Sequence, residues 1–198
     1  MKVALVAIVK DEHEYMLEWL AYHRAIIGID GVIVADNVSS DGTSQLLEAL
    51  DMAGYINRVH YPRLSPDAGP QIPAYNDIVN RFGSDYDYFL FIDADEFLVN
   101  NKAMPIQEIL SQYESHADFG ALVLNWRIFG SAGNTFKRNG LVTERFYRAS
   151  RKQEGVNRHT KVLAKSNLID QIHIHHVQLK TGFVCYDESG LPAVFLRR

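Results

Sequence analysis

The stretch 3-VALVAIV-9 decides how this chain of 198 residues is expected to fold. It is an unbroken run of aliphatic and β-branched residues, the pattern of a strand buried on both faces, as in a parallel sheet. A membrane-spanning helix needs about 20 apolar residues, and this run is far shorter. We therefore interpret it as the first strand of a sheet and not as a membrane anchor.

Outward from this strand, helical and strand patterns alternate with short connections. Apolar residues over 14–28 recur at helical spacing, and Gly28 is a plausible end of that helix. The other expected elements are strands over 31–37, 56–62, 87–92 and 119–129, helices over 43–54, 73–83 and 105–114, a basic irregular segment over 136–161, and a strand or loop over 168–180. This alternation predicts right-handed βαβ units, and therefore an α/β fold with an open, mostly parallel sheet and helices on both faces. No linker is visible, so we expect one domain over 1–198.

The composition excludes some classes of function. Lys and Arg number 20 against 24 Asp and Glu, so the net charge of -4 gives no global reason to expect nucleic-acid binding. The single cysteine, Cys185, cannot form an intrachain disulfide. No stretch reads as a transmembrane helix, so we expect a cytoplasmic protein whose membrane association, if any, is peripheral.

The run 88-YFLFIDADEFLV-99 places carboxylates where a buried strand ends. Ligands of open α/β sheets sit beyond the carboxyl ends of the strands, so Asp93 and Asp95 are expected to reach such a site. In an extended segment both side chains point to the same side and could share Mg²⁺ or Mn²⁺. The alternative is a polar turn, but the flanking apolar residues favour a cation because desolvated, unpaired charges are costly.

The stretch 173-HIHH-176 offers a third metal ligand, because imidazole also suits Mn²⁺. On a strand, His173 and His175 would share one face and His176 the other. The spacing does not decide between them, and a surface or core role remains the alternative. We take His175 as the candidate ligand.

Several motifs together carry a family resemblance. They are 9-VKDE-12, 33-IVADNVSSDGT-43, 91-FIDADEFL-98, 125-NWRIFGSAG-133, 144-ERF-146 and 159-HTK-161. In this order they resemble the nucleotide-sugar-dependent glycosyltransferases of the family 2 and family 92-like group, over nearly the whole chain. The resemblance implies a GT-A, Rossmann-like fold.

The resemblance also implies where a nucleotide-sugar donor would bind. In such enzymes the first strand-to-helix turn and the acid after the second strand hold the base and the ribose. The matching positions here are Val9, Lys10, Glu12, Asp36 and Asn37. A carboxylate there can accept hydrogen bonds from a base N–H or a ribose hydroxyl.

For the diphosphate, the resemblance points to the Asp-x-Asp motif. Asp93 and Asp95 would bind it through Mn²⁺ or Mg²⁺, with Ala94 beside the donor and its methyl group directed inward. Glu96 is expected to turn away from the metal and to brace the strand end. Lys161 could hold the pyrophosphate, the alternative being that it belongs to a solvated basic strip.

The acceptor side is expected around 125-NWRIFGSAGN-134. Trp126 and Phe129 could stack on a sugar ring, and Gly130 would let the backbone approach it closely. Packing alone is the alternative explanation for Trp126.

Loss of the acceptor's proton needs a general base, and a carboxylate is usual when the sugar configuration inverts. Our candidate is Glu144, and Asp118 is the second candidate. The alternative explanation for Glu144 is a salt bridge to Arg138, Arg145 or Arg148.

The sequence therefore predicts a metal-dependent glycosyltransferase that moves a sugar from a UDP- or GDP-sugar to a saccharide or other hydroxyl acceptor, with inversion, as in polysaccharide biosynthesis. One alternative is a metal-dependent nucleotidyltransferase, although the sequence has no glycine-rich phosphate loop. The other is a non-catalytic module that binds sugar nucleotides.

Overall fold

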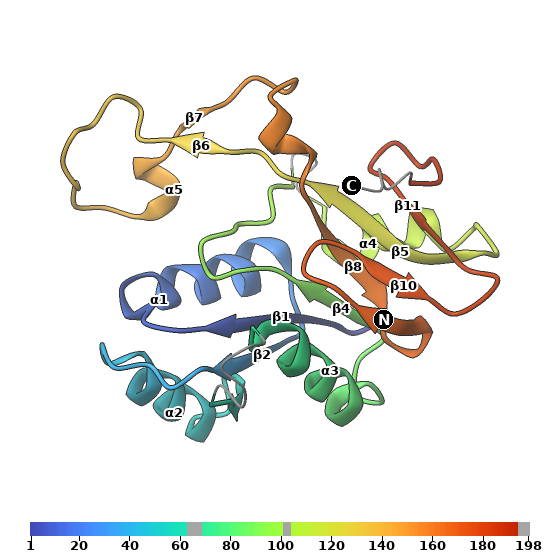
Figure 1. Cartoon of the computed structure of the whole chain (residues 1–198), viewed down its shortest axis with the longest axis horizontal. Coiled ribbons are helices and arrows are strands. Elements are labelled where there is room, and N and C mark those ends of the chain that lie inside the picture. The colour runs from blue at the N-terminus through green and yellow to red at the C-terminus, as the bar shows by residue number, and fades with distance from the viewer. Residues whose placement is uncertain (63–68, 101–103, 194–198) are drawn as a thin grey trace.

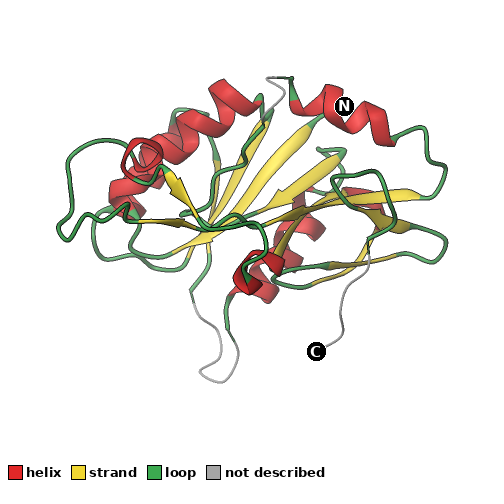
Figure 2. Cartoon of the chain, turned by 90° about the horizontal axis from the view of Figure 1, so that it is seen from above, coloured by secondary structure: helices red, strands yellow, loops and turns green. Residues whose placement is uncertain are grey.

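A seven-stranded sheet runs through the computed structural model of this chain, which describes residues 1–62, 69–100 and 104–193 (Figure 1). Its strands are β1 (Val3–Val9), β2 (Gly31–Asp36), β3 (Asn57–His60), β4 (Tyr88–Phe91), β5 (Phe119–Asn125), β8 (Thr160–Lys165) and β11 (Val184–Tyr186). They lie in the order β11-β5-β8-β4-β1-β2-β3. Figure 2 shows these strands fanned between the helices.

Most neighbouring strands of this sheet are parallel, as predicted. Strand β1 pairs in parallel with β2 and β4, β2 with β3, and β11 with β5. Strand β8 is antiparallel to both β4 and β5. The sequence prediction missed β8, and its first two residues fall in the segment expected to be irregular. This strand matters because its beginning lies at the sheet edge where β4 and β5 end.

The helices cover both faces of the sheet. They are α1 (His13–Tyr22), a π-helical turn (His23–Ile27), α2 (Thr43–Met52), α3 (Gln71–Phe82), α4 (Ile106–Tyr113), the short α5 (Val142–Arg145), and 3-10 turns over Gly155–Arg158 and Ser166–Leu168. The first helix ends as predicted, because Gly28 follows the π-helical turn with a φ of 81°, which glycine adopts without steric cost.

Alternation along the buried strands produces two cores. Leu5 of β1 packs with residues of α1, α2 and α4, whereas the next residue, Val6, packs with α3 and with the hairpin of β9 (Ile169–Ile172) and β10 (Val177–Leu179). Both side chains are fully buried, and each such side chain contributes about 1.5–3 kcal/mol of transfer free energy. The run that is apolar on both faces is thus explained by helices on both sides, which confirms the α/β fold class expected from the sequence.

Residues 126–158, which we call the arm, stand off the sheet and carry β6 (Phe129–Gly130), α5 and β7 (Arg148–Ala149) (Figure 1). The arm is tied to α1. The Glu18 carboxylate accepts hydrogen bonds from the backbone N–H groups of Val142, at 2.6 Å, and Thr143, at 3.0 Å. Lys137 forms an ion pair with Glu14. These contacts fix the arm beside the first helix.

Across the described parts of the chain, no helix has both the length and the apolar character needed to span a membrane.

Candidate active site

The candidate site lies where the sheet order reverses. Strand β1 has β2 on one side and β4 on the other, so the chain segments that follow β1 and β4 diverge and leave a crevice at their carboxyl ends. Strand β8 begins at the same edge, because it is antiparallel. The register pairs Phe91 with Val162, which places Lys161 beside the residues that follow β4.

A buried lysine holds the first aspartate of the Asp-x-Asp motif. The Nζ of Lys161, a residue only 3% exposed, donates to Oδ2 of Asp93 at 2.7 Å. The other oxygen, Oδ1, accepts from Nε2 of Gln71 at 2.9 Å. Both oxygens of Asp93 are therefore engaged, and its negative charge is balanced by an ammonium group.

Glu96 belongs to the same cluster. Its Oε2 lies 3.3 Å from Nζ of Lys161 and accepts from the backbone N–H of Asp93 at 2.8 Å. These contacts brace the strand end, as expected. That Glu96 turns away from a bound metal stays a prediction. Burial raises the pKa of Glu96 to about 7, although the Lys161 charge opposes this.

Asp95 is placed differently from Asp93. The two were expected to share one side of an extended segment, but Ala94 and Asp95 lie in a turn, so the argument from alternation is wrong. Ala94 is buried in the core, as predicted, whereas Asp95 is exposed. The charge of Asp95 acts instead on Glu12, at the start of α1.

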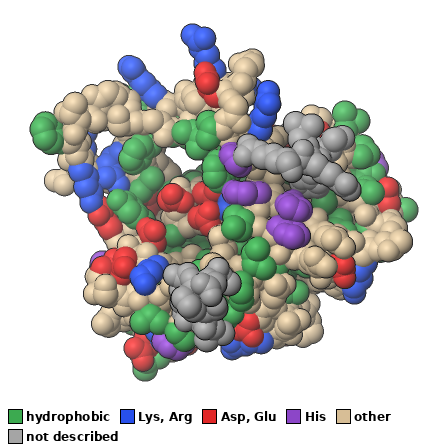
Figure 3. Space-filling model, viewed as in Figure 1, with side chains coloured by type: hydrophobic (Ala, Val, Ile, Leu, Met, Phe, Trp, Pro, Cys, Tyr) green, Lys and Arg blue, Asp and Glu red, His purple; other side chains and the backbone are tan. Residues whose placement is uncertain are grey.

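The crevice carries an excess of negative charge. Burial raises the pKa of Glu12, and the charges of Asp95, Asp41, Asp11 and Asp93 raise it further. Figure 3 shows Asp and Glu side chains gathered in the middle of this face, with histidines beside them. Carboxylates brought together in this way repel one another unless a cation compensates them.

The side chains present fit a divalent cation whose remaining ligands come from a substrate. Mg²⁺ and similar hard cations are commonly held by one or two carboxylates together with phosphate oxygens. Asp93 and Asp95 could provide those carboxylates. Among the residues that the structure describes, no three His, Cys, Asp or Glu side chains are grouped closely enough to hold a metal ion by themselves. A cation bound here would therefore need further ligands from a substrate.

The third predicted metal ligand, His175, lies in a cluster of aromatic rings. Its ring centroid is 5.5 Å from that of Trp126 and 5.0 Å from that of His159. Nδ1 of His175 and Nε1 of Trp126 are both buried and have no hydrogen-bond partner in the described chain. Burial lowers the pKa of His175, and the Lys161 charge lowers it further, which favours the neutral imidazole. Unpaired buried polar atoms are costly, and a bound ligand would satisfy them.

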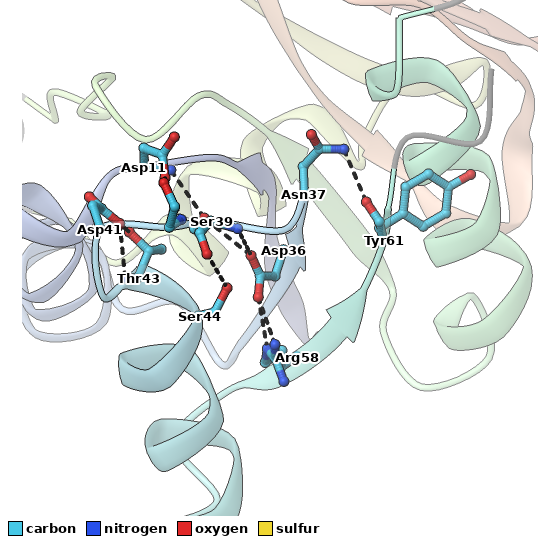
Figure 4. Close-up of polar contacts among 10 residues, drawn as sticks. Asp11, Asp36, Asn37, Ser39, Asp41, Thr43, Ser44, Arg58 and Tyr61 are labelled. Carbon is cyan, nitrogen blue, oxygen red and sulfur yellow. Dashed lines mark hydrogen bonds and ion pairs between the residues drawn. The ribbon is translucent and has the colours of Figure 1, made fainter. Parts of the chain in front are cut away.

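The acid after β2, Asp36, forms hydrogen bonds and an ion pair within the protein (Figure 4). Asp36 is fully buried, and its Oδ2 accepts from Nη2 of Arg58 at 2.7 Å. Burial alone would raise the pKa of Asp36, but the hydrogen bonds, above all that of Arg58, lower it. The side chain of Asn37 donates to the carbonyl of Tyr61 at 3.0 Å. Donor binding by these two residues stays a prediction.

The turns after β1 and β2 contain unusual backbone conformations. Asp11 has a φ of 57° and Val38 a φ of 55°, values that are rare for residues other than glycine, above all for a β-branched one. Oδ1 of Asp11 accepts from the N–H of Ser40 at 2.6 Å and joins the two turns. Such strain is concentrated at functional sites. Of the predicted donor residues here, Lys10 is exposed, whereas Val9 is buried.

The arm carries the predicted base and the three predicted acceptor residues, of which Trp126 lies in the ring cluster described above. Glu144 is exposed, and its Oε2 accepts from the N–H of Leu141 at 3.2 Å, which caps α5. None of the ion pairs in the described residues joins Glu144 to an arginine. Phe129 is 41% exposed, and a Cβ at Gly130 would meet no atom within 4 Å. Their roles stay predictions.

A cavity of about 410 Å³ lies elsewhere, at the amino end of β4. It is lined by Met1, Tyr88, Glu114 and Lys165, among others, and contains none of the predicted site residues. We therefore assign the site by the convergence of charged side chains at the carboxyl ends of the strands.

A family model described as "Glycosyltransferase family 92" matches residues 3–187. The chain belongs to glycosyltransferase family 92. A family 92 protein of Oryza sativa subsp. japonica is 25% identical over 185 residues, covering 91% of this chain and 30% of that protein. This family 92 chain thus spans about 30% of the length of the curated relatives it matches.

Solved structures resemble the family 92 chain more distantly. S. aureus TarS 1-349 has a TM-score of 0.49 and 16% identity, covering 85% of this chain and 48% of TarS. A mannosyltransferase from Pyrobaculum calidifontis, in complex with GDP-Man and Mn²⁺, has a TM-score of 0.43 and 15% identity, covering 62% of this chain and 35% of its own.

Gln71 is a site residue whose position the sequence did not reveal. The helix expected over 73–83 begins two residues earlier, at Gln71, which donates to Asp93 and to the Tyr75 hydroxyl. The fixed φ of Pro70 suits a helix start and was the available signal. The pairing of Lys161 with Asp93 had no local signal, because 68 residues separate them.

Proposed function

We propose that this chain transfers a glycosyl group from a nucleoside-diphosphate sugar, with UDP or GDP as nucleotide, to a saccharide or other hydroxyl acceptor. Family membership supports the reaction class. The observation that carries the proposal is the set of carboxylates at the switch point of the sheet, around Asp93 and Asp95, with the buried Lys161 among them. An α/β protein binds ligands at this position, and a diphosphate with a divalent cation complements these charges.

In this proposal, Asp93 and Asp95 would hold Mn²⁺ or Mg²⁺ together with the donor's phosphates. His175, the third predicted ligand, would have to move towards them to reach the cation. When bound, the cation would neutralise the charge that develops on the leaving diphosphate. The turns that contain Lys10, Glu12 and Asn37 border the nucleotide, with Val9, Asp36 and Ala94 forming the floor beneath it. The protein's task is to position these groups before the reaction.

Lys161 links the cation to the donor. Its buried ammonium needs a negative partner, because an unpaired charge in such a place costs several kcal/mol. A cation at Asp93 would compete with the ammonium for the carboxylate, and the donor's phosphates can supply the replacement charge. Metal and diphosphate should therefore bind together, with Lys161 moving from the carboxylate to the phosphate.

On the acceptor side, we propose that Trp126 and Phe129 stack on the acceptor sugar, with Gly130 allowing close approach. Glu144 takes the proton from the attacking hydroxyl, consistent with an inverting reaction. Because Glu144 now caps α5, it must release the N–H of Leu141 to act.

A thermal-shift panel of UDP and GDP, with and without Mn²⁺, tests donor binding. We expect stabilisation only when nucleotide and metal are both present, and loss of this shift in Asp95→Ala but not in Asp170→Ala, another exposed aspartate. A shift of equal size without metal would contradict the metal-dependent site.

Product analysis separates the three candidate functions. A glycosyltransferase releases UDP or GDP from the sugar nucleotide in the presence of an acceptor, a nucleotidyltransferase releases pyrophosphate from a nucleoside triphosphate, and a binding module releases neither. A cytoplasmic location stays a prediction.

A further inference from the structure

Charge is strongly segregated between the arm and the rest of the chain. Residues 126–158 contain eight Lys or Arg and two Asp or Glu, a balance of +6. The remaining residues contain twelve Lys or Arg and twenty-two Asp or Glu, a balance of -10. A chain that is acidic overall thus presents one strongly basic segment. The net charge of -4 conceals this segment, which has the electrostatic character of a binding surface for anions.

Most of the arm's cations are free to meet a partner. Two of them face the body of the protein: Lys137 pairs with Glu14, and the guanidinium of Arg145 lies over the ring of Tyr15. The other six are exposed, and none forms an ion pair with any residue that the structure describes: Arg127, Arg138, Arg148, Arg151, Lys152 and Arg158. Figure 3 shows Lys and Arg side chains projecting from the region of the arm.

The arm also exposes large apolar side chains. Phe136 is 86% exposed, Tyr147 60% and Leu141 50%. Three further members are Ile128, Phe146 and Val156. These apolar side chains alternate along the segment with the cations. For example, the guanidinium group of Arg148 lies over the ring of Tyr147, 5.9 Å from its centroid. A soluble protein surface rarely carries so many apolar groups together without a partner.

Three properties thus coincide in one segment: a positive charge without counter-ions, exposed aromatic and aliphatic side chains, and a fixed attachment to α1 through Glu18. We propose that the arm docks the protein on the surface of a membrane that contains anionic lipids. The basic groups bind the head groups, and the apolar side chains enter the interface between head groups and acyl chains. A soluble polyanion would satisfy the charges but would leave the apolar side chains in water.

This docking is independent of the proposed glycosyl transfer, but it determines the orientation of the site. The arm is tied to α1, and α1 begins beside Glu12, whose charge environment includes Asp93 and Asp95. A membrane bound by the arm would therefore lie next to the acceptor side of the crevice.

Co-sedimentation with lipid vesicles tests the proposal. We expect the intact chain to sediment with phosphatidylcholine vesicles that contain phosphatidylglycerol and not with pure phosphatidylcholine. The double variant Arg151→Glu/Lys152→Glu should lose about tenfold or more in affinity, because each basic residue near an anionic surface contributes about 1 kcal/mol. The variant Phe136→Ser/Tyr147→Ser should also bind more weakly, with circular dichroism showing that both variants fold.

Matched changes outside the arm serve as controls. Arg81→Glu/Lys180→Glu reverses two exposed charges of the body, and Met52→Ser removes a side chain that is 84% exposed. Both should sediment as the unaltered chain does. Equal binding to neutral vesicles, equal losses in the controls, or no vesicle binding at all would overturn the proposal. The arm would instead be a polyanion site if the chain bound dextran sulfate but not vesicles, and if Phe136→Ser/Tyr147→Ser left the binding of dextran sulfate unchanged.

Discussion

Lys161 is nearly inaccessible to solvent, yet its ammonium has two carboxylate neighbours, Asp93 at 2.7 Å and Glu96 at 3.3 Å. From this geometry we expect a cation to bind weakly to the site when no donor is present. The ammonium already occupies the charge environment that the cation would use. Lys161 is thus the counter-ion of Asp93 and Glu96.

Replacing Lys161 by methionine should therefore strengthen Mn²⁺ binding in the absence of nucleotide, by about tenfold or more. A positive charge near a divalent cation costs several kcal/mol even at an effective dielectric constant of about 20. The same variant should lose the coupling between Mn²⁺ and UDP. Electron paramagnetic resonance of free Mn²⁺ measures both affinities.

Lys165→Met provides a matched control for this experiment. Lys165 lies on the same strand and pairs with Glu114 at 2.7 Å, at the other end of β8. We expect its Mn²⁺ affinity to equal that of the unaltered chain. If Lys161→Met binds Mn²⁺ no better than Lys165→Met, the competition between ammonium and metal is refuted, while the proposed glycosyl transfer would still stand.

The burial of His23 should make the free energy of unfolding depend on pH, independently of the candidate site. This histidine is fully buried, and burial lowers its pKa from 6.5 to about 4, so the folded protein holds it neutral. Its ring bonds the carbonyl of Trp19 and the N–H of Leu98. The unfolded chain takes up a proton on this histidine as the pH falls below 6.5, whereas the folded chain does not until about 4.

The free energy of unfolding should therefore fall by about 3 kcal/mol between these two pH values because of His23 alone. Urea denaturation at several pH values measures this slope. His23→Gln should flatten it by that amount, and His60→Gln, a change at an exposed histidine, should leave it unchanged. An identical slope in His23→Gln and in the unaltered chain would refute the assignment.

Among the elements, α5 depends on a residue from a different helix. The carboxylate of Glu18 accepts from the N–H groups of Val142 and Thr143 and from the Thr143 hydroxyl, at 2.9 Å. Four residues cannot form a stable helix by themselves, so this charged cap holds α5 in place.

Glu18→Gln should consequently loosen α5 while leaving the sheet intact. We expect faster amide hydrogen exchange over 140–147 and a loss of about 1 kcal/mol of local stability, because charged caps contribute on this order. Mass spectrometry of exchanged peptides measures the change. Glu48→Gln, at an exposed position of α2, should alter nothing in the arm. Unchanged protection over 140–147 would refute the role of Glu18.

Elements with strong local patterns could be predicted from the sequence. The apolar runs of β1 and β2 leave little choice but a buried strand, and the glycine after residue 27 ends its helix. Strand β8 was missed because it reads TKVLAK, with lysines as its second and last residues and a basic segment before it. Only its neighbours β4 and β5, which bury its apolar centre, make it a strand.

The site shows the same division between local and distant information. The types of residue around 91-FIDADEFL-98 were sufficient to predict an acidic site at a strand end. Their directions were not, because Asp95 lies in a turn and Asp93 is held by Lys161 and Gln71, which come from β8 and α3. Contacts over such separations follow from the order and register of the strands.

Considered as a whole, the molecule places three regions around one end of its sheet. The crevice between the ends of β1 and β4 carries carboxylates, the start of β8 supplies a buried cation, and the arm presents exposed cations beside α1. We propose that the diphosphate of a sugar nucleotide joins the first two regions through a divalent cation at Asp93 and Asp95.

Electron–nuclear double resonance of bound Mn²⁺ tests this claim most directly, because it detects phosphorus nuclei coordinated to the metal through oxygen. With UDP present, we predict strong phosphorus couplings in the unaltered chain and their loss in Asp95→Asn. Nucleotide that binds equally well without metal, or bound Mn²⁺ that shows no phosphorus coupling, would contradict the claim.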